Sequence, residues 1–553
     1  VNSYTDSISR KMELKLLTIV FVVTFGQEDP VVRITDTASV RGIISYVPDN
    51  PRPAYNFLGI PYAAPPIGDN RFRVTQPFQM WTGERDATEY GSSCPQLNSF
   101  DYDEDCLFLN IWTPTLDPTA NKAVMLYIHG GSMRSGSGMR NGTGFAVLQD
   151  VIKVAINYRL GVLGFWTTGD AQAPGNYGFL DQQFAIQWVR QHIAAFGGDP
   201  NRITIYGASA GGVSVSAQVL SPMNAGLVTR AISQSGVAIA ANRVNPYFIE
   251  TPKSDLIALS VGCVDTDPGL VVACMRLLDM ETILRHEAGV WPEPVIDGTF
   301  MPDYPINLYN QGRFNKIPYI LGFNRDEGWT FSGWTPPTRE NIRGLITSYT
   351  ERMFHDNTEE IVNEAMALYV PGAIDVEYDN DTTAELLPWN TIWANNYSNF
   401  VGDLRYLGPS NDVARKHAVH ADTYMYFFNH RPNYSTRPAW TSAVHSDEAP
   451  YVEGDPFTDP DGRDYSDEGR TLSSSVMTYW ANFAKTGDPN SEGRVVWPKV
   501  TCTGIDHLEL VGTGITARTN YQPARMNFWM ERIYQLDTTH NGNYVGFPWT
   551  CPS

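Results

Sequence analysis

The sequence predicts an α/β protein with a large central, mostly parallel sheet flanked by helices. Short apolar segments rich in β-branched residues alternate along the chain with helical stretches, as a parallel sheet requires. No Ser/Gly-rich linker, internal repeat or low-complexity tract divides the 553 residues. We therefore expect one large domain over residues 27–553, although length alone would suggest several.

Six strands of this sheet can be placed from the sequence. They are expected at residues 123–128, 153–157, 203–206, 230–233, 317–322 and 423–428. One intervening helix is expected from about residue 180 to 195, since Leu180, Phe184 and Trp188 recur at helical spacing on one face. Gly197 would stop this helix.

The strand at 203–206 runs directly into a Gly-x-Ser-x-Gly sequence, residues 207–211, with Ser209 at its centre. A serine at a sharp strand-to-helix turn needs neighbours without bulk, because the backbone there is strained. Alone, the motif fits an ordinary glycine-rich turn equally well. Together with the features below it predicts a nucleophile elbow.

The strand at 123–128 ends in paired glycines, Gly130 and Gly131. Such a turn presents backbone N–H groups, which are the donors that the oxyanion of an acyl-transfer reaction requires. We expect Gly130, Gly131 and the N–H of Ala210 to form an oxyanion hole. The alternative is a plain glycine turn after a strand.

An acid and a histidine follow later strands. Asp326 and Glu327 come after the strand at 317–322, and His445 lies in the polar loop after the strand at 423–428. The chain order serine, acid, histidine is that of α/β-hydrolases, and it differs from the orders of chymotrypsin and subtilisin. Sequence spacing alone does not decide whether Asp326 or Glu327 is the carboxylate that pairs with His445.

These motifs together resemble the type-B carboxylesterase/lipase family, which includes the cholinesterases. The matching segments are residues 57–63, 104–111, 129–131, 196–200, 207–211, 326–328 and His445, and they cover roughly residues 30 to 545. The resemblance implies an α/β-hydrolase fold with Ser209 as nucleophile, Glu327 as acid and His445 as base. Asp326 is then the less favoured carboxylate, and we expect it to be exposed.

The resemblance also implies structural contacts. Arg71 with Glu104, and Arg159 with Asp181, correspond to ion pairs that hold loops in place. Ser235 is expected near His445. Disulfides are implied for Cys94 with Cys106 and for Cys263 with Cys274, and the remaining two of the six cysteines, Cys502 and Cys551, are expected to pair.

The N-terminal region predicts export. A charged segment at residues 12–15 precedes an apolar run at 16–25, which is too short to cross a bilayer. We interpret residues 12–26 as a signal peptide, the rival interpretation being a signal anchor. Six cysteines fit an oxidising compartment, so a secreted, extracellular protein without a stable membrane anchor is expected. Sequons for N-glycosylation stand at Asn141, Asn380, Asn396 and Asn433.

The net charge of −20 argues against a nucleic-acid partner, because phosphates would be repelled. A generally solvated acidic surface is the simpler interpretation, although such a surface can steer cationic substrates. His417 and His420 stand at i and i+3, but no third ligand is near them in the sequence, so neither a metal nor another cofactor is expected. The sequence does not predict an oligomeric state.

Departures from the cholinesterase pattern limit the substrate. Ala208 stands where cholinesterases carry a glutamate, and the loop between Cys94 and Cys106 contains Phe100 and Tyr102 but no tryptophan. Quaternary ammonium binds best against a tryptophan face. A small-molecule or lipid ester that is neutral is therefore the expected substrate, rather than a choline ester.

The acyl side of the predicted substrate pocket is expected to be wide. Ala288 and Val290 are small where cholinesterases narrow this pocket with phenylalanines, so medium acyl groups would fit. Trp291, Trp329 and Phe331 would line the pocket or fill part of it, although packing against the core is an equally good interpretation of each.

A binding function is the competing hypothesis. Neuroligin-like members of the family keep the fold, lack catalysis and act in adhesion. Such members usually lack the serine or the histidine, whereas this chain has the whole triad. Because Ala208 departs from the family pattern, the hypothesis of a catalytically weak or inactive binding protein remains an alternative.

Overall fold

The structure is a computed structural model of the chain. It describes residues 28–97, 102–240, 244–286, 289–331, 337–338, 341–354, 356–370, 389–458, 462–537 and 551. The expected signal peptide at residues 12–26, the pocket residue Ala288, the loop residue Phe100 and the sequon at Asn380 lie outside these ranges. No helix within them has the length and apolar character needed to cross a membrane.

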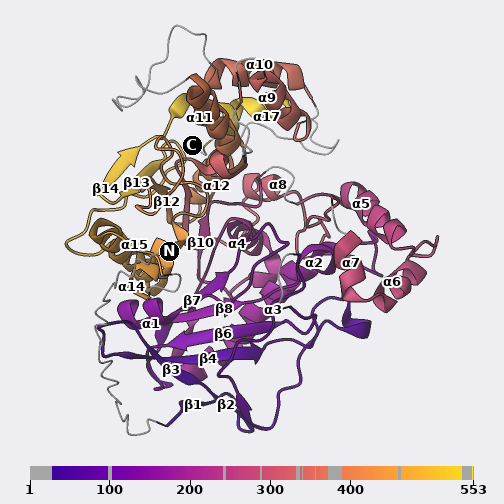
Figure 1. Ribbon diagram of the computed structural model, residues 1–553, viewed down its shortest axis with the longest axis vertical. Helices are drawn as coiled ribbons and strands as arrows, with labels where there is room; N and C mark the ends of the chain where they lie inside the picture. The colour runs from indigo at the N-terminus through magenta and orange to yellow at the C-terminus, as the bar shows by residue number, and fades with distance from the viewer. Residues whose placement is uncertain are drawn as a thin grey trace, which may run out of the picture.

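A large sheet runs through the molecule (Figure 1). Its strands are β3 (Ile43–Tyr46), β4 (Pro53–Pro61), β6 (Phe108–Thr113), β7 (Lys122–Ile128), β8 (Ile152–Ile156), β9 (Gly198–Ala208), β10 (Arg230–Gln234), β11 (Tyr319–Asn324), β12 (Thr423–Phe428), β13 (Asp506–Val511) and β14 (Gly514–Thr519). Their order is β14-β13-β12-β11-β10-β9-β7-β8-β6-β4-β3. The pairings from β13 to β8 are parallel and those at both ends are antiparallel. The predicted fold class, a mostly parallel sheet flanked by helices, is confirmed.

A second, small sheet lies beside the first. It consists of β1 (Val31–Arg33), β2 (Ala38–Arg41) and β5 (Gly83–Asp86). β1 pairs with β2 in antiparallel fashion, and β2 pairs with β5 in parallel. All three strands lie in the first part of the chain, before the segments that carry the catalytic motifs.

All six predicted strands belong to the large sheet, with shifted ends in several cases. β11 begins at Tyr319 rather than 317, because Pro318 has no N–H to give to a neighbouring strand. β9 begins five residues earlier than predicted, at Gly198, where it pairs with Lys122 of β7. The strands β3, β4, β6, β13 and β14, each of which has at least one antiparallel neighbour, were not among the six.

Helices cover both faces of the sheet. They are α1 (Thr143–Gln149), α2 (Gly161–Phe165), α3 (Tyr177–His192), α4 (Ala210–Leu220), α5 (Tyr247–Ser260), α6 (Pro268–Leu277), α7 (Met280–His286), α8 (Pro305–Asn310), α9 (Ile342–Glu351), α10 (Thr358–Tyr369), α11 (Trp389–Gly402), α12 (Gly408–Ala418), α13 (Ala449–Glu453), α14 (Asp455–Thr458), α15 (Asp467–Thr486), α16 (Pro523–Asn527) and α17 (Ile533–Leu536). Figure 1 shows α9, α10, α11 and α17 gathered at one end, and α5, α6 and α7 at one side. The helix predicted at 180–195 is α3, which begins three residues earlier and continues as a 3₁₀ turn to Phe196 before Gly197 ends it at φ 83°.

Alternate residues of the central strands enter two separate cores. In β7, Val124, Leu126 and Ile128 pack into the core that α3 and α4 cover. Met125 and Tyr127 pack into the core that α1 and α15 cover. Because successive side chains of a strand point to opposite faces, both faces of the sheet are buried, as expected for parallel strands.

The two disulfides and two ion pairs expected from the family resemblance are present, and so is the disulfide expected between the remaining two cysteines. Disulfides join Cys94 to Cys106, Cys263 to Cys274 and Cys502 to Cys551. Arg71 binds Glu104 through two hydrogen bonds, of 2.7 and 2.5 Å, and its NH1 also donates to the carbonyl of Leu278. Arg159 binds Asp181 in the same bidentate way, at 2.8 and 2.7 Å. These arginines hold separate loops together, and they make no contact with the candidate triad.

The parallel strands place the predicted functional residues at one edge. Gly130 follows β7, Ser209 follows β9, Glu327 follows β11 and His445 lies in the loop after β12. Since the carboxyl ends of parallel strands meet at the same edge of a sheet, residues far apart in sequence converge there.

Candidate active site

Ser209 occupies a strained turn between β9 and α4. Its φ is 59° and its ψ is −124°, a conformation that costs a non-glycine residue on the order of 1–3 kcal/mol. A Cβ on Gly207 would lie 2.3 Å from the carbonyl oxygen of Ile128, and one on Gly211 would lie 2.1 Å from the same oxygen. Both flanking glycines are therefore required by close backbone approach, which keeps the turn tight and exposes part of Ser209.

A continuous chain of hydrogen bonds joins Ser209, His445 and Glu327, the three residues of the predicted triad. His445 Nε2 lies 2.8 Å from Ser209 Oγ, and His445 Nδ1 lies 2.5 Å from Glu327 Oε2. The side chains of Glu327 and His445 are buried, at 0% and 6% exposed, whereas Ser209 is half-buried. The second carboxylate oxygen of Glu327 accepts from the N–H of Asn324 at 2.7 Å and from Ser235 Oγ at 2.5 Å. Ser235 therefore interacts with His445 indirectly, through the carboxylate of Glu327.

Asp326 is buried, and the expectation that it would be exposed is wrong. Its side chain accepts a hydrogen bond from the N–H of Ser442 at 2.5 Å, and its own N–H donates to the carbonyl of Ala443 at 2.8 Å. The residue is 3% exposed, and burial raises the pKa of its carboxyl. Asp326 thus ties the end of β11 to the loop that carries His445, and Glu327 contacts the imidazole.

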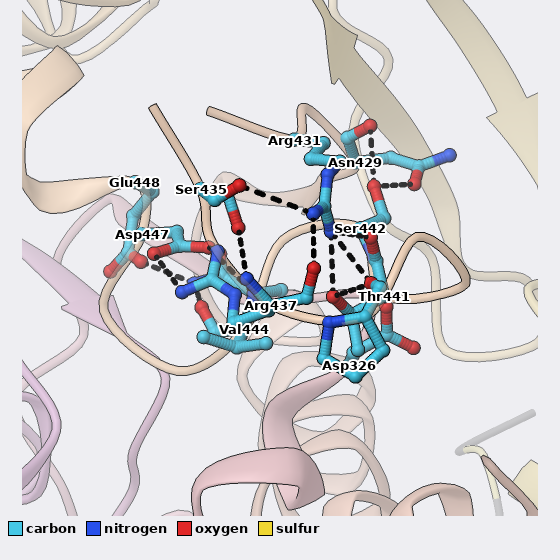
Figure 2. A network of polar contacts seen from close by, with 12 residues as sticks. Asp326, Asn429, Arg431, Ser435, Arg437, Thr441, Ser442, Val444, Asp447 and Glu448 are labelled. Carbon is cyan, nitrogen blue, oxygen red and sulfur yellow. Dashed lines mark hydrogen bonds and ion pairs between the residues drawn. The ribbon is translucent and has the colours of Figure 1, made fainter. Parts of the chain in front are cut away.

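A polar network connects residues of the loop that carries His445 (Figure 2). The guanidinium of Arg437 binds the carboxylate of Asp447, which also accepts from the N–H of Val444 at 2.9 Å. Arg431 donates to the carbonyl oxygens of Thr441 and Arg437, at 2.5 and 2.7 Å. Arg431 thereby satisfies carbonyl groups of an irregular loop, and Arg437 fixes its Asp447 carboxylate, so the loop has a defined course around His445.

A second buried carboxylate lies behind the triad. Glu448 accepts from Gln234 Nε2 at 3.2 Å and from Asn324 Nδ2 at 2.5 Å. Asn324 Nδ2 also donates to the carbonyl of Val444 at 2.8 Å. Burial, and next the charge of Glu327, raise the pKa of Glu448 to about 7. No role for Glu448 is predicted from the sequence, although its position three residues after His445 was an available signal.

Two aromatic rings pack on the imidazole of His445. Tyr406 lies 4.6 Å from it and Phe331 lies 5.1 Å from it, between ring centroids. Phe331 was predicted in the substrate pocket. Tyr406 was missed, because it belongs to a π-helical turn at Asp403–Leu407 that has no motif in the sequence. Such turns are frequent at functional sites.

The glycines after β7 come close to the nucleophile. A Cβ on Gly130 would lie 2.5 Å from the carbonyl oxygen of Ala208 and 3.2 Å from Ser209 Cβ. Gly131 has a φ of 102°, which only glycine adopts readily. Ala210 begins α4, where the first N–H groups have no acceptor within the helix. Gly130 and Ala210 therefore lie beside Ser209, and Gly131 follows Gly130 in the same loop.

His129 supports this glycine loop. Its Nδ1 lies 2.8 Å from the carbonyl oxygen of Gly130, and its ring stacks on Tyr158 at 4.3 Å. Burial lowers the pKa of His129 to about 4, so the ring is neutral near pH 7. A neutral imidazole can donate from Nδ1 to that carbonyl, which orients the peptide after Gly130.

The other predicted pocket residues have different surroundings. Ala208 is the buried last residue of β9. Trp291 lies under the guanidinium of Arg134, and Trp329 packs edge-on against Trp440 at 5.1 Å. Val290 is half-buried and packs against a core cluster that includes Trp166. Ala208 and Phe331 are thus the predicted pocket residues that lie next to a triad member.

His417 lies by a backbone carbonyl and packs against an aromatic ring. Its Nε2 lies 2.7 Å from the carbonyl oxygen of Ile317, and its ring stacks on Phe314 at 4.8 Å. Burial lowers its pKa to about 4. No group of His, Cys, Asp and Glu suited to a metal ion occurs in the described part of the chain.

Three sequons lie within the described ranges. Asn141 and Asn433 are exposed, and Asn396 is half-buried in α11. The side chain of Asn433 contacts residues 464 and 466 of a neighbouring loop. The two exposed sequons are accessible on the folded surface.

The fold agrees with comparisons to known proteins. The model of the carboxylesterase family matches residues 28–529. An acylcarnitine hydrolase of Rattus norvegicus is 35% identical over 560 residues, covering 95% of this chain and 96% of that protein. A medium-chain fatty acyl-CoA hydrolase precursor of Anas platyrhynchos is 34% identical over 556 residues, covering 94% and 95%. Neuroligin-2 of Mus musculus is 33% identical over 564 residues, covering 88% and 66%. With the family model matched over almost the entire described chain, this protein belongs to the carboxylesterase family of carboxylic ester hydrolases.

Proposed function

We propose that the chain is a secreted serine hydrolase that cleaves carboxylic esters through an acyl-enzyme intermediate. The observation that carries the proposal is the unbroken chain from Glu327 through His445 to Ser209, at 2.5 and 2.8 Å. A serine hydroxyl is a weak nucleophile until a neighbouring base takes its proton. The buried imidazole of His445 is in hydrogen-bond contact with that hydroxyl.

The reaction follows from the roles of these groups. Ser209 Oγ attacks the ester carbonyl while its proton passes to His445 Nε2, and the imidazolium then protonates the departing alcohol. Water attacks the acyl-serine in the second half, with His445 again accepting the proton. Glu327 accepts from Nδ1 and stabilises the imidazolium. N–H groups of Gly130, Gly131 and Ala210 receive the oxyanion, and each such donor is worth about 3 kcal/mol in related sites.

Neutral esters with medium acyl groups are the proposed substrates, rather than choline esters. Ala208 brings no carboxylate next to Ser209, so the site lacks the charge that supports a cation there. The segment between Cys94 and Cys106 contains no tryptophan to face a quaternary ammonium group. The name of the Anas platyrhynchos relative, a medium-chain hydrolase, supports acyl groups longer than acetyl.

Secretion as a single domain over residues 27–553 is part of the proposal. Three disulfides favour an oxidising compartment. Expression in secretory cells should release a protein whose first residue is Gln27, and treatment with an N-glycosidase should lower its mass. Retention of residues 12–26 in a membrane fraction would favour the signal-anchor interpretation.

A labelling experiment tests the enzymatic proposal against a binding function. The similarity to neuroligin-2 favours a catalytically weak or inactive binding protein as the second candidate. A fluorophosphonate probe should label Ser209, as mapped by mass spectrometry, and 4-nitrophenyl butanoate should be hydrolysed. Ser209→Ala should abolish both. A folded wild-type protein that takes no label and hydrolyses no ester would favour the binding function.

A further inference from the structure

Gln96 belongs to the segment that the disulfide between Cys94 and Cys106 closes. The residue is 8% exposed, so its amide needs hydrogen-bond partners inside the protein. One partner lies in its own segment, because Gln96 Nε2 donates to the carbonyl oxygen of Cys94 at 3.0 Å. The catalytic motifs assign no role to this glutamine.

The other partner of the Gln96 amide is the backbone of Gly136, 40 positions later in the chain. The N–H of Gly136 donates to Gln96 Oε1 at 2.8 Å, and Gln96 Nε2 donates to the carbonyl oxygen of Gly136 at 3.0 Å. A planar amide that meets both polar groups of one residue fixes the position of that residue and its orientation. The disulfide segment thus holds the loop that contains Gly136.

Gly136 lies against the first glycine of the predicted oxyanion hole. A Cβ on Gly136 would lie 2.7 Å from the carbonyl oxygen of Gly130 and 2.4 Å from Nδ1 of His129. His129 Nδ1 in turn lies 2.8 Å from the same carbonyl oxygen. The carbonyl of Gly130 is therefore enclosed by the backbone of Gly136 and the ring of His129.

The peptide bond transmits this restraint to a predicted oxyanion donor. In a planar trans peptide, the carbonyl of Gly130 and the N–H of Gly131 point in opposite directions. The contacts that fix the Gly130 carbonyl therefore also fix the direction of the Gly131 N–H. The same loop is closed on its other side, because the N–H of Ser135 donates to the carbonyl oxygen of Gly131 at 3.0 Å. Gly136 follows directly after this turn.

We propose that Gln96 is a positioning residue of the oxyanion hole. Through Gly136 it orients the peptide that carries the Gly131 N–H, and it thereby couples the disulfide loop of Cys94 and Cys106 to catalysis. The proposal rests on the esterase function proposed above. Gln96 acts on the direction of a donor and makes no contact with substrate. Because oxyanion donors bind the transition state more strongly than the ester, its removal should lower the rate of the chemical step rather than substrate binding.

Removal of the amide tests the proposal. Gln96→Met keeps the length of the side chain and lacks both hydrogen-bonding groups. A misplacement of about 1 Å at a catalytic group costs up to about 100-fold in rate. We therefore expect kcat on 4-nitrophenyl butanoate to fall by about 10- to 100-fold, with KM within about threefold of the wild type. The pH dependence of kcat/KM should keep its shape, because the contacts of Glu327 and His445 are unchanged.

A transition-state analogue reports on the oxyanion hole itself. Ser209 Oγ adds to the carbonyl of butyl trifluoromethyl ketone, its proton passes to His445, and the carbonyl oxygen becomes an alkoxide that the hole binds. In Gln96→Met, Ki for this ketone should rise by the same factor by which kcat/KM falls. Gly136→Ala should show the same correspondence, because its methyl group would displace the Gly130 carbonyl directly.

Asn490 provides the matched control. Its Oδ1 accepts from the N–H of Trp497 at 2.6 Å and its Nδ2 donates to the carbonyl oxygen of Trp497 at 3.1 Å, so the same pairing of an amide with one backbone residue recurs there. Trp497 belongs to the core that α1 and α15 cover. Asn490→Leu should therefore lower the melting temperature and leave kcat and Ki unchanged.

The outcomes separate this proposal from the esterase function. Full kcat in folded Gln96→Met, or a kcat loss without a rise in Ki, would overturn the positioning role while the esterase function stands. A kcat loss of similar size in Asn490→Leu would do the same, since it would indicate general destabilisation. If Gln96→Met does not fold, Gln96→Glu, which keeps an acceptor for the Gly136 N–H, is judged by the same correspondence of Ki and kcat/KM. If the wild type hydrolyses no ester and Ser209 takes no fluorophosphonate, the esterase function itself fails.

Discussion

The carboxylate of Asp326 accepts a hydrogen bond from the N–H of Ser442 at 2.5 Å, three residues before His445. The two adjacent acids after β11 therefore have different roles. Glu327 contacts the imidazole of His445, and Asp326 holds the loop on which His445 stands. Because both are buried, removal of the Glu327 carboxylate is expected to affect mainly catalysis, and removal of the Asp326 carboxylate mainly stability.

The first prediction distinguishes the roles of Glu327 and Asp326. Glu327→Gln should lower kcat by about 10⁴-fold with little change in melting temperature, because the amide cannot stabilise the imidazolium. Asp326→Asn should lower the free energy of unfolding by about 1–3 kcal/mol and reduce kcat less, because a loop contact is weakened. Both variants are compared on one nitrophenyl ester and by thermal unfolding. A larger kcat loss in Asp326→Asn would reverse the assignment of the acid.

The second prediction concerns Gly130. Gly130→Ala would place a methyl group 2.5 Å from the carbonyl oxygen of Ala208, so the loop must move away from Ser209. We expect a kcat loss of about 100-fold or more, from a displaced oxyanion donor. Gly344→Ala is the matched control, since a Cβ there meets no atom within 4 Å and the residue lies inside α9. The control should keep full activity and gain about 0.5–1 kcal/mol in stability. Equal activity of the two variants would remove Gly130 from the oxyanion hole.

The third prediction uses the buried carboxyl of Glu448. Burial raises its pKa from the ordinary 4.5 to about 7. Between these values the folded chain keeps a proton that the unfolded chain has lost, so this group makes the free energy of unfolding fall as pH rises from about 4.5 to 7. Above about 7 its contribution no longer changes. Glu448→Gln should flatten this decline, as measured by urea unfolding at pH 5, 6, 7 and 8.

The control for Glu448 is Glu531→Gln, which alters a half-exposed carboxylate that pairs with Arg415. Its unfolding free energy should follow the pH dependence of the wild type. If Glu448→Gln also follows the wild type in parallel at all four pH values, Glu448 does not titrate in this window.

The fourth prediction concerns choline. Acetylcholine should not exceed its uncharged carbon isostere, 3,3-dimethylbutyl acetate, by tenfold in kcat/KM. A desolvated cation–π contact is worth about 2 kcal/mol, and the site has neither a tryptophan in the segment between Cys94 and Cys106 nor a carboxylate at Ala208. Butanoyl and octanoyl nitrophenyl esters should be cleaved at least as efficiently as the acetyl ester. An acetylcholine preference of tenfold or more would mean that other residues build a cation site.

The sequence by itself determined the features that depend on neighbours along the chain. The strand at 203–206, the turn at Ser209 and the stop at Gly197 were predictable, because strand propensity, glycine and helix termination act over a few residues. Glu327 was chosen over Asp326 by family resemblance, since both carboxylates occupy equivalent places after β11. The antiparallel strands at the sheet edges were missed, because their pairing is decided by contacts across the sheet.

Only the tertiary structure decided the contacts between distant segments. Tyr406 reaches His445 from a helix 39 positions earlier in the chain, and Gln234 reaches Glu448 across 214 positions. The burial of Asp326 has the same origin, because its partner Ser442 lies 116 residues away. Side-chain burial and electrostatic environment are properties of packing in three dimensions, so local sequence patterns carry no signal for them.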